Sequence, residues 1–119
     1  MIVNYPGLKS HPQHAVALKQ HREGMGGGML SFRLRAGSTA AATFCKQLRI
    51  FTLAVSLGGV ESLAEIPARM THSMIPQSQR EAGGMFDDLV RLSCGIEDAG
   101  DLLDDVMQAL EKAVAVQNS

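Results

Sequence analysis

Residues 50–66 constrain the fold of this chain more than any other stretch, because two apolar runs flank a pair of glycines. The first run spans Ile50–Leu57, and the second spans Val60–Ile66, where a proline ends it. Short apolar runs bounded by Gly and Pro predict buried strands. Gly58 and Gly59 allow the backbone to bend sharply and to approach a ligand closely. We therefore predict two strands joined by a bend that carries Ser56, and we expect any binding function at that bend.

The remaining pattern alternates short strands with helices. Residues 89–95 and 30–35 alternate apolar and polar side chains, which is the period of half-buried strands, and residues 2–5 form a third short candidate. Apolar spacing and capping residues predict helices at 10–21, 39–48, 78–82 and from residue 101 onward. These elements predict an α+β fold of two layers, with a mainly antiparallel sheet and helices packed on one face.

Composition narrows the class of protein. With 119 residues and a formal net charge of −1, the chain predicts one globular domain without a nucleic-acid-binding patch. It has no apolar stretch of the roughly 20 residues that a membrane span needs, and no signal-peptide pattern. Cys45 and Cys94 are far apart, which favours two buried thiols in a cytoplasmic protein over a disulfide or metal site. An apolar segment that begins at Ile2 suggests a cut into a longer chain.

Several patterns that could carry chemistry are better explained without it. The glycines at 24–28 follow a helix and precede a strand, the reverse of the order that a phosphate-binding loop needs. His11 and His14 lack a nearby third ligand, so surface histidines are favoured over a metal site. Ser56 is not in a nucleophile-elbow pattern. The adjacent acids at 87–88 and 104–105, and the arginines at 33 and 35, are expected to be solvated.

Arg91 is the exception, because it is flanked by apolar residues on a predicted strand. A guanidinium is a planar fork that matches a carboxylate bidentately. If it is buried, it must have a partner. The residues alone leave two readings open, an internal salt bridge or exposed edge, and a binding site.

Five segments resemble a known family when they are taken together and in this order. They are Tyr5–Leu8, Ser10–His14, Ser56–Leu63, Pro67–His72 and Leu89–Asp98. The combination resembles the C-terminal domain of the Cys/Met-metabolism family of PLP-dependent enzymes, with its cystathionine gamma-lyase, gamma-synthase and beta-lyase branches. Residues 84–91 look most like the fungal gamma-lyases. The resemblance implies that residues 1–119 form a domain that packs against a larger PLP-binding domain. It also implies that the whole protein is a homo-oligomer, specifically a homotetramer.

The resemblance also implies site residues for a sulfur amino-acid substrate. Arg91 would grip the substrate's α-carboxylate, Ser56 and the backbone of Leu57 would line the same pocket, and Thr71 would lie nearby. Val55 occupies a position where many gamma-lyases have glutamate, so the choice among gamma-elimination, beta-elimination and replacement stays open.

The family's Schiff-base lysine has no counterpart here. The lysines are Lys9, Lys19, Lys46 and Lys112, and none lies in a matching motif. We therefore expect no PLP bound to this chain alone and no lyase activity without another segment. The alternative is a free-standing, non-catalytic interaction domain derived from the same family, because an apolar face left without its neighbour would favour association.

Overall fold

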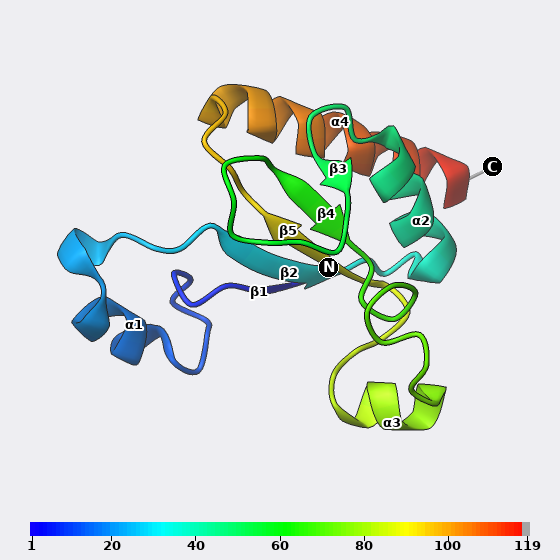
Figure 1. Ribbon diagram of the computed structural model, residues 1–119, viewed down its shortest axis with the longest axis horizontal. Coiled ribbons are helices and arrows are strands. Elements are labelled where there is room, and N and C mark those ends of the chain that lie inside the picture. Colours follow the sequence, from blue (N-terminus) through cyan, green and yellow to red (C-terminus); the bar gives the residue numbers. More distant parts are fainter. Residues whose placement is uncertain (118–119) are drawn as a thin grey trace.

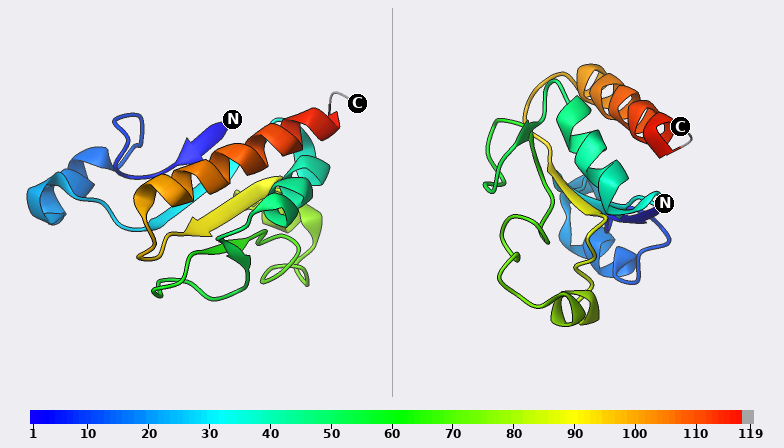
Figure 2. Two further views of the ribbon diagram at one scale, coloured as in Figure 1. Left: turned by 90° about the horizontal axis from the view of Figure 1, so that it is seen from above. Right: turned by 90° about the vertical axis from the view of Figure 1, so that its right-hand side faces the viewer.

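The computed structural model describes residues 1–117. Its five-stranded sheet has the order β1-β2-β5-β4-β3, and one helical layer covers one face of that sheet (Figures 1 and 2). The strands are β1 (Ile2–Asn4), β2 (Met29–Arg33), β3 (Thr52–Leu53), β4 (Leu63–Glu65) and β5 (Leu89–Ser93). The helices are α1 (His14–Gln20), the 3-10 turn η1 (Arg22–Gly24), α2 (Gly37–Gln47), α3 (Gln77–Ala82) and α4 (Ala99–Gln117).

The sheet is mixed, which corrects the expectation of a mainly antiparallel one. Strands β1 and β2, β2 and β5, and β4 and β5 pair antiparallel, whereas β3 pairs parallel to β4. The parallel pair joins Thr52 to Leu63 and Leu53 to Ala64 in register. The chain between them, residues 54–62, leaves the end of β3 and returns to the start of β4, so both strands run the same way. We call residues 54–62 the glycine bend.

The core lies between the sheet and the pair α2 and α4. Phe44 of α2 is fully buried and meets Phe32 of β2 edge-to-face, with ring centroids 5.2 Å apart. Val90 and Leu92 of β5 contribute the sheet side of the same cluster. Figure 2 shows α2 and α4 on the same face of the sheet, as the sequence predicts. Helices α1 and α3 bury no residue and lie outside this layer.

Two expectations about local structure are wrong. Helix α1 begins at His14 rather than near Ser10, because tight turns from Leu8 to His11 and from His11 to His14 precede it. The apolar runs of the central stretch form only the short strands β3 and β4. Val55, Leu57 and Val60 are more than half exposed, because the glycine bend lies against β5 and the residues after it instead of entering the core.

Candidate substrate-binding site

The site is built on the face of the sheet opposite α2 and α4, which we call the loop-side face. Side chains alternate between the two faces of a sheet along each strand. Val90 and Leu92 point to the helices, so Leu89, Arg91 and Ser93 point to the loop-side face. The glycine bend and the turns that follow Pro67 also lie off the helical layer (Figure 2).

Arg91 projects from the middle of β5 and is held by a buried acid and by the glycine bend. Its Nη2 atom lies 2.8 Å from Oε2 of Glu65, the residue directly opposite on β4. The same nitrogen donates to the carbonyl oxygens of Val55 at 3.1 Å and Ser56 at 3.4 Å. The internal salt bridge that the sequence left open is therefore observed, and it forms next to the glycine bend. The binding-site reading stays a prediction.

Glu65 is the site residue that sequence reasoning missed. It is fully buried, and neither of its carboxylate oxygens accepts a well-directed hydrogen bond from residues 1–117, so the ion pair with Arg91 is its compensation. The available signal was a single acid inside the apolar run Leu63–Ile66, since a charge on a buried strand needs a partner. Which partner it finds depends on the cross-strand register.

A pocket of about 300 Å³ opens beside Arg91. Thr71 and His72 line it from the turn that follows Pro67, and Arg91 lines it from β5. Its other lining residues are Asn4, Met29, Leu30, Ser31, Pro67, Met85 and Leu89. His72 was not expected in the pocket, and its Nδ1 lies 2.8 Å from the Thr71 hydroxyl. The structure therefore brings Arg91 and Thr71 together, and it adds an imidazole whose hydrogen bond is to Thr71.

The remaining expected site residues lie on the glycine bend rather than among the pocket-lining residues. Val55 and Ser56 reach Arg91 through their backbone carbonyls, and the Val55 side chain is exposed. Leu57 is exposed by 53% and does not line the pocket. The bend therefore forms one boundary of the space in front of the guanidinium, and the pocket lies on another side.

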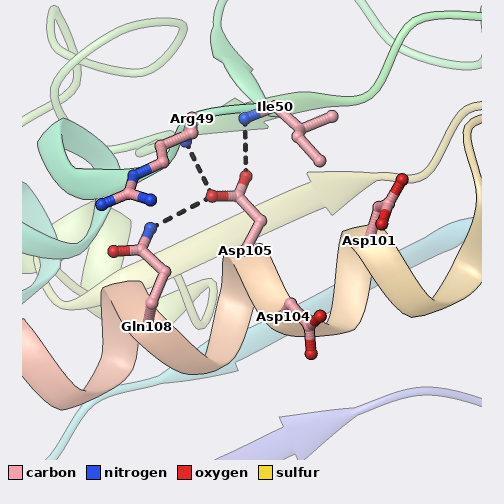
Figure 3. Close-up of a pocket in the computed structure, with 6 residues that line it drawn as sticks. All are labelled: Arg49, Ile50, Asp101, Asp104, Asp105 and Gln108. Carbon is pink, nitrogen blue, oxygen red and sulfur yellow. Dashed lines mark hydrogen bonds between the residues drawn. The ribbon is translucent and has the colours of Figure 1, made fainter.

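Asp105 is not the solvated acid that the sequence predicted. It is 4% exposed, and its carboxylate accepts hydrogen bonds from the backbone N–H groups of Arg49, Ile50 and Phe51 at 2.8, 2.7 and 3.2 Å. Gln108 adds a bond at 3.1 Å (Figure 3). Burial, the largest single influence, raises the pKa of Asp105, but these hydrogen bonds together lower it below its ordinary value. Asp105 thus fixes the start of the central stretch to α4. Asp104 is exposed, as expected.

The acids at 87–88 and the arginine at 33 are also paired rather than free. Arg33 forms a salt bridge with Asp88 at 2.8 Å and stacks over the Phe86 ring at 3.6 Å, while Asp87 accepts from Arg80 at 3.0 Å. These contacts anchor the segment around α3 to β2. Arg35 is exposed, as expected. Within residues 1–117, no group of three His, Cys, Asp or Glu side chains is placed to hold a metal ion.

Together, the fold and this site define an α+β domain that presents an arginine and a threonine to a small pocket. That is a site suited to a carboxylate-bearing small molecule. A family model described as Cys/Met metabolism PLP-dependent enzyme matches residues 1–111. The chain belongs to this family.

Individual relatives agree with that assignment. Cystathionine gamma-lyase of Saccharomyces cerevisiae is 62% identical over 111 residues, which are 93% of this chain and 28% of the relative. Cystathionine gamma-synthase of Mycobacterium leprae is 59% identical over 108 residues, 91% of this chain and 26% of the relative. The chain thus spans little more than a quarter of the length of these relatives.

Solved structures share the fold. The crystal structure of yeast cystathionine gamma-lyase superposes with a TM-score of 0.91 at 60% identity, covering 96% of this chain and 29% of that chain. Cystathionine gamma synthase from Xanthomonas oryzae pv. oryzae, solved in complex with cystathionine, gives a TM-score of 0.86 at 49% identity, covering 97% of this chain and 29% of that chain. The resemblance to fungal cystathionine gamma-lyases is therefore confirmed.

The family is PLP-dependent, and the pocket residues can be compared with what that cofactor requires. Covalent attachment of PLP needs a lysine amine, and none of the chain's lysines lines the Arg91 pocket. The arginine and threonine of this pocket suit a carboxylate, and a covalently held PLP would need a lysine from outside its lining.

Proposed function

We propose that this chain supplies the part of a transsulfuration carbon–sulfur lyase or synthase that binds the substrate's α-carboxylate. On this proposal, residues 1–119 form the C-terminal domain, a second segment brings the PLP-binding lysine, and the chain alone is inactive. The observation that carries the proposal is the position of Arg91, at the junction of the pocket and the glycine bend.

The guanidinium keeps donors available for a ligand. Every side-chain hydrogen bond and ion pair that Arg91 makes with residues 1–117 comes from Nη2. A guanidinium has five N–H donors, so Nε and Nη1 can still meet a carboxylate. Glu65 and the two carbonyls fix the plane of the group before a ligand arrives, which reduces the entropy lost on binding.

The other site residues have supporting roles in this proposal. Ser56 and the backbone of Leu57 lie on the bend next to the carbonyls that Arg91 contacts, and they would complete the grip on the amino acid. Thr71, positioned by its bond to His72, would face the substrate from the pocket. Val55, exposed on the bend, would meet the substrate's side chain and influence which sulfur amino acid is preferred and which elimination or replacement follows.

The test is a segment exchange. This chain would replace the matching segment of yeast cystathionine gamma-lyase, and the chimera would be assayed with L-cystathionine. Arg91→Lys keeps the charge that compensates Glu65 but loses the planar fork. We expect its KM to rise by about tenfold or more, the cost of about 1.4 kcal/mol of substrate binding. The matched control is Arg35→Lys, an exposed arginine beyond β2, for which KM should stay unchanged. An unchanged KM in Arg91→Lys would show that Arg91 is structural.

Cofactor binding provides a second test, because the proposal places substrate binding on this chain and PLP binding on another segment. The chimera should show the absorbance of lysine-bound PLP, whereas the isolated chain incubated with PLP should show none. A stoichiometric lysine-bound chromophore on the isolated chain would contradict the proposal that another segment must bring the cofactor machinery.

A second candidate function, a non-catalytic interaction domain, is favoured by one observation. The N-terminal segment exposes Ile2, Val16, Leu18 and Met25 by more than half, and α1 buries no residue. Such a surface would suit association with a second copy or with a full-length relative. Sedimentation of the chain with and without Leu18→Glu would detect self-association that depends on α1. If the chain is a monomer with and without the substitution, self-association through α1 is excluded, and only the first proposed function is left.

We also propose that the protein is cytoplasmic. Cys45 and Cys94 are both free thiols, which suits the reducing cytoplasm. Within residues 1–117, no helix combines the length and the apolar content that a membrane crossing requires.

A further inference from the structure

The glycine bend is attached to β5 at four successive points. The first two points are side chains of β5, and the other two lie in the segment that follows it. Arg91 donates to the carbonyls of residues 55 and 56. Ser93 is buried, and its hydroxyl oxygen accepts a hydrogen bond from the backbone N–H of Gly58 at 2.8 Å. Residues spaced by two along an extended chain share one face. The face of β5 that carries Arg91 therefore also holds the next part of the bend.

Gly95 and Ile96 make the third attachment. The backbone N–H of Ile96 donates to the carbonyl of Val60 at 3.0 Å. The chains approach so closely here that a Cβ at Gly95 would overlap the Val60 carbonyl oxygen. Only glycine leaves room for this contact, because any side chain would have to push the bend away.

Glu97 makes the fourth attachment, through the buried residue Ser62. Its carboxylate accepts the backbone N–H of Ser62 at 3.0 Å and the Ser62 hydroxyl at 2.6 Å. The Ser62 oxygen in turn accepts the backbone N–H of Gly95 at 2.8 Å. The hydrogen bonds from the Ser62 hydroxyl and N–H lower the pKa of Glu97, so the carboxylate is ionised near neutral pH and both bonds are charge-assisted.

We infer that Glu97, together with Ser93, is a positioning residue for the substrate-binding bend. Leu57 lies between two attached points, the Arg91 contacts at 55 and 56 and the Ser93 contact at 58. Its side chain is not buried in the core, so the path of this part of the bend is set by the attachments. The inference rests on the proposed function for its consequence, that a held bend presents Ser56 and Leu57 to a substrate. The attachment itself is independent of that function.

The first test is amide hydrogen exchange on this chain. Glu97→Ala removes both acceptors of Ser62, and Glu97→Gln keeps one amide oxygen. We expect exchange at the amides of Gly58 and Ser62 to accelerate by about tenfold or more in the Ala variant, the effect of losing one net hydrogen bond, and by less in the Gln variant. The amides of Val90 and Leu92 report global opening, and their exchange should change much less.

The matched control is Glu61→Ala. Glu61 is exposed in the same bend and makes no side-chain hydrogen bond or salt bridge with residues 1–117. Exchange at Gly58 and Ser62 should stay at the wild-type rate in this variant. If Glu97→Ala accelerates exchange evenly across the bend and β5, Glu97 contributes only to global stability. If the variant does not accelerate exchange, Glu97 is only a surface residue. Either result overturns the inference.

The second test uses the yeast chimera described above. Glu97→Ala should raise KM for L-cystathionine by several-fold with a smaller change in kcat, and Glu97→Gln should recover part of the loss. A loosened bend with unchanged KM would overturn the positioning role. If instead Arg91→Lys leaves KM unchanged in the same chimera, the proposed function fails, and the exchange measurement still decides whether Glu97 holds the bend.

Discussion

Arg91 Nη2 and Glu65 Oε2 lie 2.8 Å apart across the β4–β5 pair, at positions that are directly opposite in register. Glu65 is fully buried, whereas the Arg91 side chain is 23% exposed. Nη2 of the guanidinium therefore compensates a charge inside the protein, while the same side chain lines the pocket. The arginine that we assign to substrate binding is also part of what keeps the sheet folded.

This relationship predicts that Arg91→Ala is destabilising. The substitution would leave the Glu65 carboxylate buried without its counter-charge, and breaking a buried pair in this way costs about 3–5 kcal/mol of unfolding free energy. Arg35→Ala, the control on an exposed arginine, should change it by less than about 0.5 kcal/mol. Urea unfolding followed by circular dichroism measures both.

The double variant Arg91→Ala with Glu65→Leu separates the two contributions. Removing both charges should regain most of the lost stability, because no unpaired ion remains in the sheet. If the double variant is as unstable as Arg91→Ala, the loss comes from packing or from the contacts with the glycine bend rather than from the buried charge.

A second prediction concerns Asp105, which holds three backbone N–H groups of residues 49–51. Asp105→Ala should lower the free energy of unfolding by about 3 kcal/mol, because several buried donors lose a charged acceptor. The neighbouring Asp104→Ala is a matched control, since Asp104 is exposed on the same helix turn (Figure 3). Equal effects of the two substitutions would contradict the capping role of Asp105.

The lowered pKa of Asp105 predicts a pH dependence of stability. In the unfolded chain an aspartate titrates near its ordinary pKa of about 3.9. Because the folded pKa is lower, the stabilisation is fully present above the unfolded value and is lost as pH falls through the folded value. Between about pH 5 and pH 2, wild type should therefore lose more unfolding free energy than Asp105→Asn. Parallel curves for the two proteins would mean that Asp105 does not carry this dependence.

The two thiols should differ in reactivity. Burial raises the pKa of Cys45 to about 11, so its thiol stays protonated and covered near neutral pH. Cys94 is half-buried, and burial and the nearby Glu97 also raise its pKa. Labelling with a disulfide reagent should modify Cys94 first, and Cys94→Ser should react only when the protein is unfolded. Rapid labelling of Cys45 in native Cys94→Ser would contradict the packing of α2.

Much of the fold could be predicted from local pattern. The alternation at residues 89–93 gives β5 and places Arg91 opposite Val90 and Leu92, as observed. The helical spacing from residue 101 onward predicts α4, which begins two residues earlier at Ala99, and the five motif segments identify the family. These features follow from the chain itself, because strand and helix periods, caps and motifs are properties of neighbouring residues.

Other features were decided by contacts between distant residues. The apolar run 50–57 predicts a buried strand, yet only Thr52–Leu53 forms a strand and residues 54–57 belong to the glycine bend. That bend is attached to β5 by Arg91, Ser93 and Glu97, more than 30 residues away. Helical spacing places Asp105 on the same face as Leu102 and Ala109, but only the approach of residues 49–51 to α4 makes it a buried acceptor.

The sequence by itself therefore determined β2 and β5, the main helices and the family, and it singled out Arg91 as the candidate for substrate binding. Tertiary structure alone decided that β3 runs parallel to β4, that Glu65 faces Arg91, and that the bend is held rather than free. The physical reason is that register and loop path depend on long-range hydrogen bonds and buried charges, whose partners no local period specifies.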